Sequence, residues 1–265
     1  MEPLQLEFLV TNDDSYLSKG IRTVAEVLSA YGNVTVVAPK EVQSGMSAAL
    51  TLTRPLRLKK ESSSKTEYNT NINVYSFTGT PADCVKIAMN EFFLDKKPNL
   101  LVSGINHGSN ASVASVYSGT LGAAAEGTIY GVPSVGLSID THNPDADFSG
   151  VVNNLPQILE NVLATPPAAG VYLNINFPSG SIKGIKFAKQ GNGMWIKEFD
   201  KRVDPHGNPY YWMTGHFLDT EDNPIGDHKL LADGYVTIVP HNVDSTNYNE
   251  MERLGKLWQL PDAEE

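Results

Sequence analysis

Short apolar runs alternate with helix-like segments through the first 140 residues, and this alternation limits the possible folds more than any other feature. The runs predicted as strands are residues 6–10, 34–38, 72–77, 100–102 and 132–137. Between the first two, Ile21, Val24, Ala25 and Leu28 follow the i, i+3, i+4, i+7 spacing of an amphipathic helix. Apolar strands that alternate with helices predict a mostly parallel, Rossmann-like α/β sheet with helices on both faces.

Several residues indicate where the helices begin and end. Ser18 is a plausible N-cap and Gly32 a plausible C′ residue of the first helix. Thr80 followed by Pro81 and, at the third position, Asp83 is typical of a helix start, and Cys84 just inside that helix is expected in the core. A helix of small residues is predicted over 121–130, and the polar stretch 59–71 shows no strand or helix pattern.

The pattern changes after about residue 140. Residues 151–163 have helical spacing, with Pro156 expected near the start or at a kink, and residues 171–177 alternate like a strand. From residue 180 on, glycines, aromatic and β-branched residues predict hairpins, and residues 246–258 predict a final helix. We therefore expect a Rossmann-like catalytic core over 1–178 and a C-terminal hairpin and oligomerisation segment over 179–265, which need not be an independent domain.

Charge and composition narrow the classes of function. The 265 residues carry 20 basic and 30 acidic side chains, so the net charge is −10, which argues against a protein that binds nucleic acid through phosphate neutralisation. Cys84 is the only cysteine, so no disulfide can form within the chain and a reducing compartment fits best. No apolar run approaches the length of a membrane span. We expect a cytoplasmic protein without a nucleic-acid or membrane partner.

Asp13 and Asp14 directly follow the first predicted strand. In open α/β sheets ligands bind beyond the carboxyl ends of the strands. Two adjacent carboxylates repel each other until a divalent cation arrives, and oxygen ligands favour Mg²⁺ or Mn²⁺ over zinc. The alternative is that one of the two acids only caps a turn or a helix.

Three further segments are expected at the same edge of the sheet. Residues 103–110 combine Gly104 and Gly108 with two asparagines, although a glycine-rich turn would explain them equally well. Residues 117–120 precede a helix and offer backbone N–H groups and hydroxyls for an anion, while residues 44–47 add hydroxyls in a flexible loop. His107 is a candidate general acid or metal ligand, but a single histidine is more often neither.

Other features point to no site. The chain contains no G-x-S-x-G elbow and no G-x-G-x-x-G, so the hydrolase-triad and dinucleotide-binding interpretations lack support. Asp219, Asp222 and Asp227 lack the spacing of a calcium loop, and we expect them in a solvated or interface loop.

Taken in order, these segments resemble the SurE (survival protein E) family of metal-dependent 5′/3′-nucleotidases. The matching stretches are TNDD at 11–14, VTVVAP at 34–39, SGMSAALTLTRPLR at 44–57, GTPADCV at 79–85, VSGINHGSN at 102–110, YSGTLGAAAEG at 117–127, GVPSVGLS at 131–138, LNINFP at 173–178 and GYVTIVP at 234–240. One departure is Ser15, where the family usually has glycine; a positive φ there would strain serine by about 1–3 kcal/mol.

The resemblance implies a residue set, a cofactor and an assembly. It implies one divalent cation per subunit, Mg²⁺ or Mn²⁺, held by Asp13, Asp14, Ser44 and Asn106. It implies phosphate contacts from Gly45, Asn110, Ser118, Gly119 and Thr120. It also implies nucleoside 5′- and 3′-monophosphates as substrates, polyphosphate as an occasional one, and a homodimer or tetramer with exchanged C-terminal segments.

The reaction expected from these residues is metal-assisted hydrolysis of a phosphomonoester by water, with Asp13 and Asp14 in the catalytic role. One alternative is an aspartyl-phosphate-forming phosphatase with Asp13 as nucleophile, although such enzymes place their acids as Asp-x-Asp rather than side by side. A weaker one makes Ser44 the nucleophile. A third alternative is a module that binds nucleotide or metal without turnover.

Overall fold

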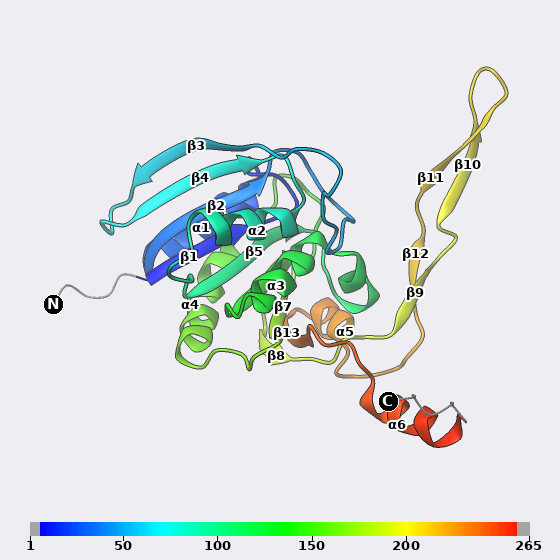
Figure 1. The fold of residues 1–265 in the computed structure, drawn as a ribbon. Helices are drawn as coiled ribbons and strands as arrows, with labels where there is room; N and C mark the ends of the chain where they lie inside the picture. The colour runs from blue at the N-terminus through cyan, green and yellow to red at the C-terminus, as the bar shows by residue number, and fades with distance from the viewer. Residues whose placement is uncertain (1–5, 259–265) are drawn as a thin grey trace, which may run out of the picture.

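The computed structural model of the chain describes residues 6–258, and a nine-stranded β-sheet forms its centre (Figure 1). In spatial order the strands are β3 (Leu58–Lys65), β4 (Asn71–Phe77), β2 (Gly32–Pro39), β1 (Leu6–Thr11), β5 (Leu100–His107), β6 (Ser134–Ile139), β7 (Val171–Phe177), β13 (Tyr235–Asn242) and β8 (Gly184–Phe187). The six strands from β4 to β7 run parallel, whereas β3 and β13 are antiparallel to β4 and β7. The mostly parallel sheet confirms the expected fold class.

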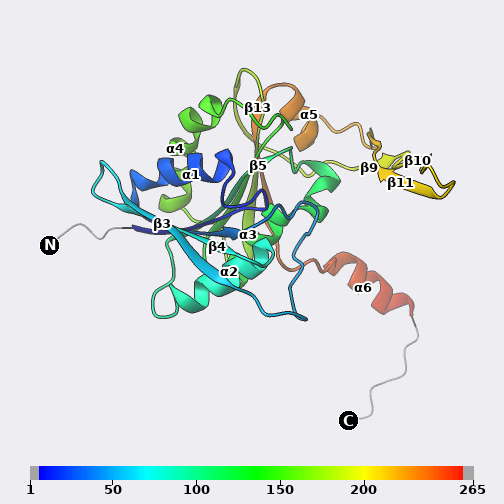
Figure 2. The same ribbon diagram turned by 90° about the horizontal axis from the view of Figure 1, so that it is seen from above.

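Two helices cover each face of the sheet (Figure 2). The helices α1 (Lys19–Ser29) and α4 (Ser149–Ala164) lie on one face, and α2 (Pro81–Glu91) and α3 (Gly119–Ile129) lie on the other. Phe8 belongs to the core on the α1 side and its neighbour Leu9 to the core on the α2 side, because successive side chains of a strand point to opposite faces. Among the described residues, no helix is long and apolar enough to cross a membrane.

The predicted helix starts are confirmed. The Ser18 hydroxyl accepts a hydrogen bond from the backbone N–H of Ile21 at 3.3 Å, which caps α1. Thr80 and Asp83 form a reciprocal capping box at the start of α2, and Cys84 is fully buried behind it.

Three local predictions differ from the structure. Gly32 opens β2 instead of ending α1, because a β-carbon there would overlap the carbonyl oxygen of Leu6 on the neighbouring strand. The polar stretch contains β3, an exposed edge strand whose lysines and serines hide the strand pattern. β5 continues to His107, beyond the apolar run 100–102, with a register shift against β6 between Ser103 and Asn106. Pro156, expected near the start of its helix or at a kink, lies inside α4, and the kink stays a prediction.

The C-terminal part supplies both sheet strands and a projecting arm (Figure 1). β8 and β13 extend the main sheet, while β9 (Gly193–Ile196) pairs with β12 (His216–Asp219) and β10 (Phe199–Val203) with β11 (Pro209–Met213). The two ribbons form the arm, which confirms the predicted hairpins. The helices α5 (Asp227–Ala232) and α6 (Tyr248–Leu257) precede and follow β13, so the final helix is also confirmed. A domain boundary at residue 178 stays a prediction.

The close approach of β1 and β2 gives a first test. We expect Gly32→Ala to lower the free energy of unfolding by about 3 kcal/mol or more, because the new methyl group forces two paired backbones apart. Gly180→Ala is the matched control, since a β-carbon there meets no atom within 4 Å. Urea unfolding of both variants measures the difference; equal midpoints would contradict the steric explanation.

Candidate functional site

The predicted site residues lie together at the carboxyl edge of the parallel strands. The loop after β2 contacts the loop after β1, because the N–H of Gln43 donates to the carbonyl of Asp13 at 2.7 Å. The same loop reaches the segment before α3, where the N–H of Ser47 donates to the carbonyl of Tyr117 at 3.1 Å. Side chains join the other pairs, with Thr120 bonded to Asp13 and His107 to Asp14. Segments that are far apart in sequence therefore surround one small region.

Asp13 is a buried carboxylate that faces the start of α3. Its Oδ1 accepts a hydrogen bond of 2.6 Å from the Thr120 hydroxyl, and only 4% of the residue is exposed. Burial raises the pKa of Asp13 to about 6; the Thr120 hydrogen bond opposes this rise and the negative charge of Asp14 adds to it. Gly119 leaves room for the carboxylate, since a β-carbon there would lie 3.0 Å from Cβ of Asp13. Among residues 6–258, no positively charged side chain forms an ion pair with Asp13.

Asp14 is held by one residue at the end of β5. Its Oδ2 accepts the backbone N–H of His107 at 3.0 Å and lies 3.1 Å from Nδ1 of the same histidine. The His107 ring packs edge-on against Phe148, with 5.5 Å between ring centroids. Oδ1 of Asp14 has no donor among the described residues and is available to a ligand. His107 thus contacts a predicted metal-binding acid rather than standing alone.

The other two predicted metal ligands also offer oxygen. Asn106 donates from Nδ2 to the carbonyl of Gly108 at 2.7 Å, and its Oδ1 has no donor within residues 6–258. Ser44 is exposed, and its hydroxyl makes no hydrogen bond in the described part of the chain. That part contains no group of three or more His, Cys, Asp or Glu side chains that could hold a metal ion by themselves. Two carboxylates with an amide and a hydroxyl oxygen fit a hard cation such as Mg²⁺ or Mn²⁺ and do not fit zinc.

The start of α3 and its surroundings can hold an anion. Ser118 caps the helix, since its Oγ accepts the N–H of Leu121 at 3.1 Å and its own proton stays available to a ligand. Asn110 uses one proton of Nδ2 for a 2.8 Å bond to the Ser138 hydroxyl and keeps the other. Gly45 has a positive φ of 75° with open space where a side chain would lie. The helix dipole and free N–H groups favour negative charge here.

The turn between β1 and α1 has the conformation that would suit glycine. Ser15 has a φ of 80°, in the left-handed region, at a cost of about 1–3 kcal/mol for a side chain that is not glycine. Three hydrogen bonds hold it there: its carbonyl accepts Nδ2 of Asn12 at 2.9 Å and N–H of Ser18 at 3.1 Å, and its Oγ accepts N–H of Leu17 at 3.2 Å. Serine therefore preserves the turn that presents both acids.

Sequence reasoning missed several supporting residues. Asp83 also accepts the N–H of Thr51 at 3.2 Å and so fastens the 44–57 loop, a role beyond its helix cap. Asp227, expected in a solvated or interface loop, is completely buried and accepts N–H groups of Ser112 and Gly191, each at 2.9 Å. The expectation of a solvated loop was wrong for Asp227, because its carboxylate accepts hydrogen bonds from two chain segments that are distant in sequence and adjacent only in the fold. No spacing in the sequence could have shown this contact.

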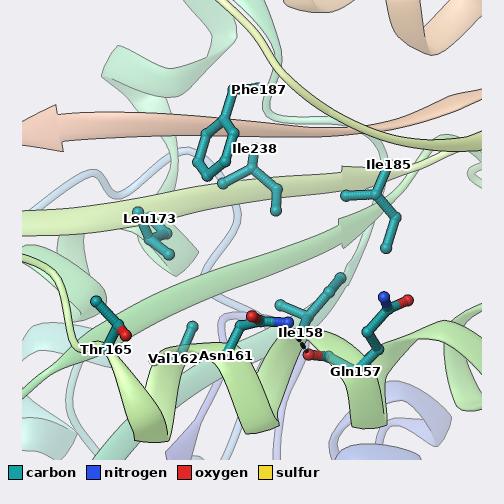
Figure 3. Close-up of a pocket in the computed structure, with 9 residues that line it drawn as sticks. All are labelled: Gln157, Ile158, Asn161, Val162, Thr165, Leu173, Ile185, Phe187 and Ile238. Carbon is teal, nitrogen blue, oxygen red and sulfur yellow. Dashed lines mark hydrogen bonds between the residues drawn. The ribbon is translucent and has the colours of Figure 1, made fainter.

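A separate pocket of about 380 Å³ lies away from these residues (Figure 3). It is bounded by α4 and by strands β7, β8 and β13, with Ile158, Leu173 and Phe187 among its apolar walls. Leu173 lies near the start of β7, whereas the acids follow the carboxyl end of the parallel β1. A pocket without a charged side chain in its lining is a poor place for a phosphate.

Comparisons with known proteins agree on one family. The family model described as "Survival protein SurE" matches residues 8–197. The 5′-nucleotidase SurE of Cytophaga hutchinsonii is 43% identical over 255 residues, which are 95% of this chain and 96% of that protein. The same enzyme of Christiangramia forsetii is 44% identical over 261 residues, or 96% and 97% of the two chains. The crystal structure of the SurE protein from Aquifex aeolicus superposes with a TM-score of 0.78 at 35% identity, covering 95% of this chain and 99% of that one.

The raised pKa of Asp13 predicts a pH-dependent cost in the metal-free protein. A carboxyl whose folded pKa exceeds its unfolded value of 3.8 contributes full stability below pH 3.8 and loses it as the pH rises through about 6. A shift from 3.8 to about 6, at about 1.4 kcal/mol per pKa unit, corresponds to about 3 kcal/mol. We therefore expect the metal-free Asp13→Asn variant to have a free energy of unfolding about 3 kcal/mol higher than that of the wild type at pH 8. Near pH 4 the two free energies should be equal.

Urea unfolding at the two pH values measures this difference, and added Mn²⁺ should stabilise the wild type but not the variant. Asp95→Asn, a substitution of an exposed acid, is the matched control. A variant that is no more stable than the wild type at pH 8 without metal would show that burial of the Asp13 charge costs nothing.

Proposed function

This chain belongs to the survival protein SurE family, and from that membership we propose that it is a divalent-metal-dependent 5′-nucleotidase. It hydrolyses nucleoside monophosphates, at the 5′ or the 3′ position, to a nucleoside and phosphate. One observation carries the assignment to this site: the Thr120–Asp13 hydrogen bond joins the acid pair to the anion-binding start of α3. This contact supports a cation site next to a phosphate site, the arrangement that metal-assisted hydrolysis of a phosphomonoester requires.

The proposed metal ligands are Asp13, Asp14, Ser44 and Asn106, one cation per subunit, Mg²⁺ or Mn²⁺. When bound, such a cation offsets the two negative charges and lowers the pKa of a water molecule, which makes that water a nucleophile near neutral pH. The protein holds the acids in place beforehand, through Thr120 on Asp13 and His107 on Asp14. Residues that hydrogen-bond to metal ligands orient those ligands for the metal in this way.

The proposed phosphate contacts are Gly45, Asn110, Ser118, Gly119 and Thr120. Ser118 can donate its hydroxyl proton, and the N–H of Gly119 in the first turn of α3 has no helical partner. Asn110 can donate its second amide proton. The Thr120 hydroxyl proton is already committed to Asp13, so we propose that this side chain mainly orients the acid. These donors stabilise the negative charge on the phosphoryl oxygens during in-line attack by water.

The alternative with Asp13 as nucleophile has less support. Asp13 is almost fully buried, and its Oδ1 is bonded to Thr120, which limits its approach to phosphorus. The alternative of a module that binds without turnover conflicts with the names of the related 5′-nucleotidases. Trapping of an aspartyl-phosphate would favour the first alternative, and the absence of multiple turnovers the second.

We place the enzyme in the cytoplasm as a homodimer or a tetramer with exchanged C-terminal segments. The buried free cysteine is compatible with a reducing compartment. The arm leaves the body of the protein and exposes Tyr211, Trp212 and Met213, while α6 has no buried residue (Figure 1). A contiguous exposed apolar surface supports association at the arm.

Loss of a proposed ligand gives the main test of function. Mutation of a residue that hydrogen-bonds to a metal ligand typically lowers metal affinity or activity about 10- to 100-fold. Loss of the proposed ligand Asp14 itself should therefore lower activity at least about 100-fold. We expect Asp14→Asn to fold normally and to lose Mn²⁺-dependent release of phosphate from AMP to that extent, while Asp95→Asn retains it. Near-normal turnover in Asp14→Asn, or full-speed turnover by a chelator-stripped wild type, would contradict the metal mechanism.

The exposed aromatic residues of the arm give a test of assembly. We expect Trp212→Glu to weaken self-association at least about tenfold, because a buried interface tryptophan typically contributes about 2 kcal/mol or more. Size-exclusion chromatography with light scattering measures the mass over a dilution series. Leu94→Glu changes another exposed apolar residue, after α2, and should leave the mass unchanged. A monomeric wild type, or an unchanged mass in Trp212→Glu, would exclude the arm as an interface.

A further inference from the structure

Two buried asparagines on β7 hold the main chain of a proposed phosphate contact. The backbone N–H of Asn110 donates to Oδ1 of Asn176 at 2.7 Å, and the backbone carbonyl of Asn110 accepts Nδ2 of Asn174 at 2.9 Å. The two side chains are joined to each other, since Nδ2 of Asn176 donates to Oδ1 of Asn174 at 2.9 Å. Both hydrogen-bonding groups of one peptide residue are thus bound by a single connected pair.

This pair occupies positions where the fold would ordinarily place apolar side chains. Asn174 and Asn176 are completely buried, and their neighbours Ile175 and Phe177 belong to the hydrophobic core on the other face of the sheet. Burial of an amide without partners costs on the order of kilocalories per mole, so such residues persist in a core only when they are fully hydrogen-bonded. The side-chain hydrogen bonds of Asn174 and Asn176 join the two residues to each other and to the backbone of Asn110.

The neighbouring strand extends the network to the side chain of Asn110. Ser138 on β6 is opposite Asn176 in the sheet register, and its hydroxyl accepts Nδ2 of Asn110 at 2.8 Å. Backbone and side chain of Asn110 are therefore both fixed, and only the second proton of Nδ2 and the carbonyl Oδ1 stay available to a ligand. A donor held this way loses little conformational freedom when it binds phosphate.

We infer that Asn174 and Asn176 are positioning residues for nucleotide hydrolysis, which act by fixing Asn110 against the phosphoryl group. The inference rests on the proposed function, because it takes Asn110 to be a phosphate contact. Neither asparagine reaches the substrate. Their effect is to set the distance between the Asn110 amide and the start of α3, between which the phosphate lies.

The test compares Asn176→Ala, Asn174→Ala and Asn110→Ala, with AMP and Mn²⁺ as the assay. A misplacement of about 1 Å can cost up to about 100-fold in rate, so we expect kcat/KM to fall about 10- to 100-fold in each variant. Inorganic phosphate should inhibit each of them correspondingly more weakly, while the Kd for Mn²⁺ stays unchanged. A merely structural role would not separate phosphate affinity from metal affinity.

A double substitution distinguishes positioning from general destabilisation. If Asn176 acts through Asn110, Asn110→Ala/Asn176→Ala has the same kcat/KM as Asn110→Ala alone; losses that multiply would overturn the inference. Ile175→Ala, on the same strand but facing the opposite core, should lower Tm and keep kcat/KM at temperatures where it is folded. If Asn176→Ala does not fold, Asn174→Ala carries the test, since it removes the contact with the Asn110 carbonyl and the bond between the two asparagines but leaves Oδ1 of Asn176 to accept the Asn110 N–H.

The outcomes also separate this inference from the proposed function. A wild type that releases no phosphate from AMP overturns the proposed function and the inference together. Turnover by the wild type with an unimpaired Asn110→Ala overturns the assignment of Asn110. Turnover with an impaired Asn110→Ala and an unimpaired Asn176→Ala overturns only the positioning role.

Discussion

The hydrogen bond from Thr120 to Asp13 connects the two halves of the site, and the rest of the arrangement depends on it. Asp13 follows β1, whereas Thr120 lies in the first turn of α3, far along the chain. The bond requires both to meet at one edge of the sheet, and Gly119 provides the space for the carboxylate. A single contact therefore joins the proposed cation site to the proposed phosphate site.

Without a cation, two neighbouring carboxylates lower the stability of the fold. Hydrogen bonds from the surrounding residues reduce this loss of stability but do not remove it. Burial raises the pKa of Asp13 to about 6 even though the Thr120 hydroxyl donates to it. Burial therefore favours the neutral form of this carboxyl over the charged form. His107 contributes two contacts to Asp14 but leaves one oxygen of that acid open. Folding thus keeps two acids near each other at some cost in stability, and binding of the proposed divalent cation would recover that cost.

Much of the fold could be predicted because the core strands and helices have clear periodicity. β1, β2, β4 and the caps at Ser18 and Thr80 follow from local rules. The edge strand β3 could not be predicted, since Lys59, Lys60 and the serines pair in a sheet without burying apolar side chains. The candidate residues of the site were found from strand ends and from a family resemblance. Their supports, Asp227 above all, escaped because a buried acid that binds distant N–H groups resembles a surface acid in sequence.

The two ends of the glycine-rich segment after β5 are fixed from opposite sides. His107 is bonded to Asp14 in the β1 loop, and Asn110 is bonded to Asn174 and Asn176 on β7. Between them lie Gly108 and a sharp change of direction, with a φ of 102° at the glycine. A segment that is flexible by composition is held by its attachments, because one anchor follows β1 and the other lies on β7, two strands of the same sheet. Attachments of this kind can preorganise hydrogen-bond donors for a developing charge.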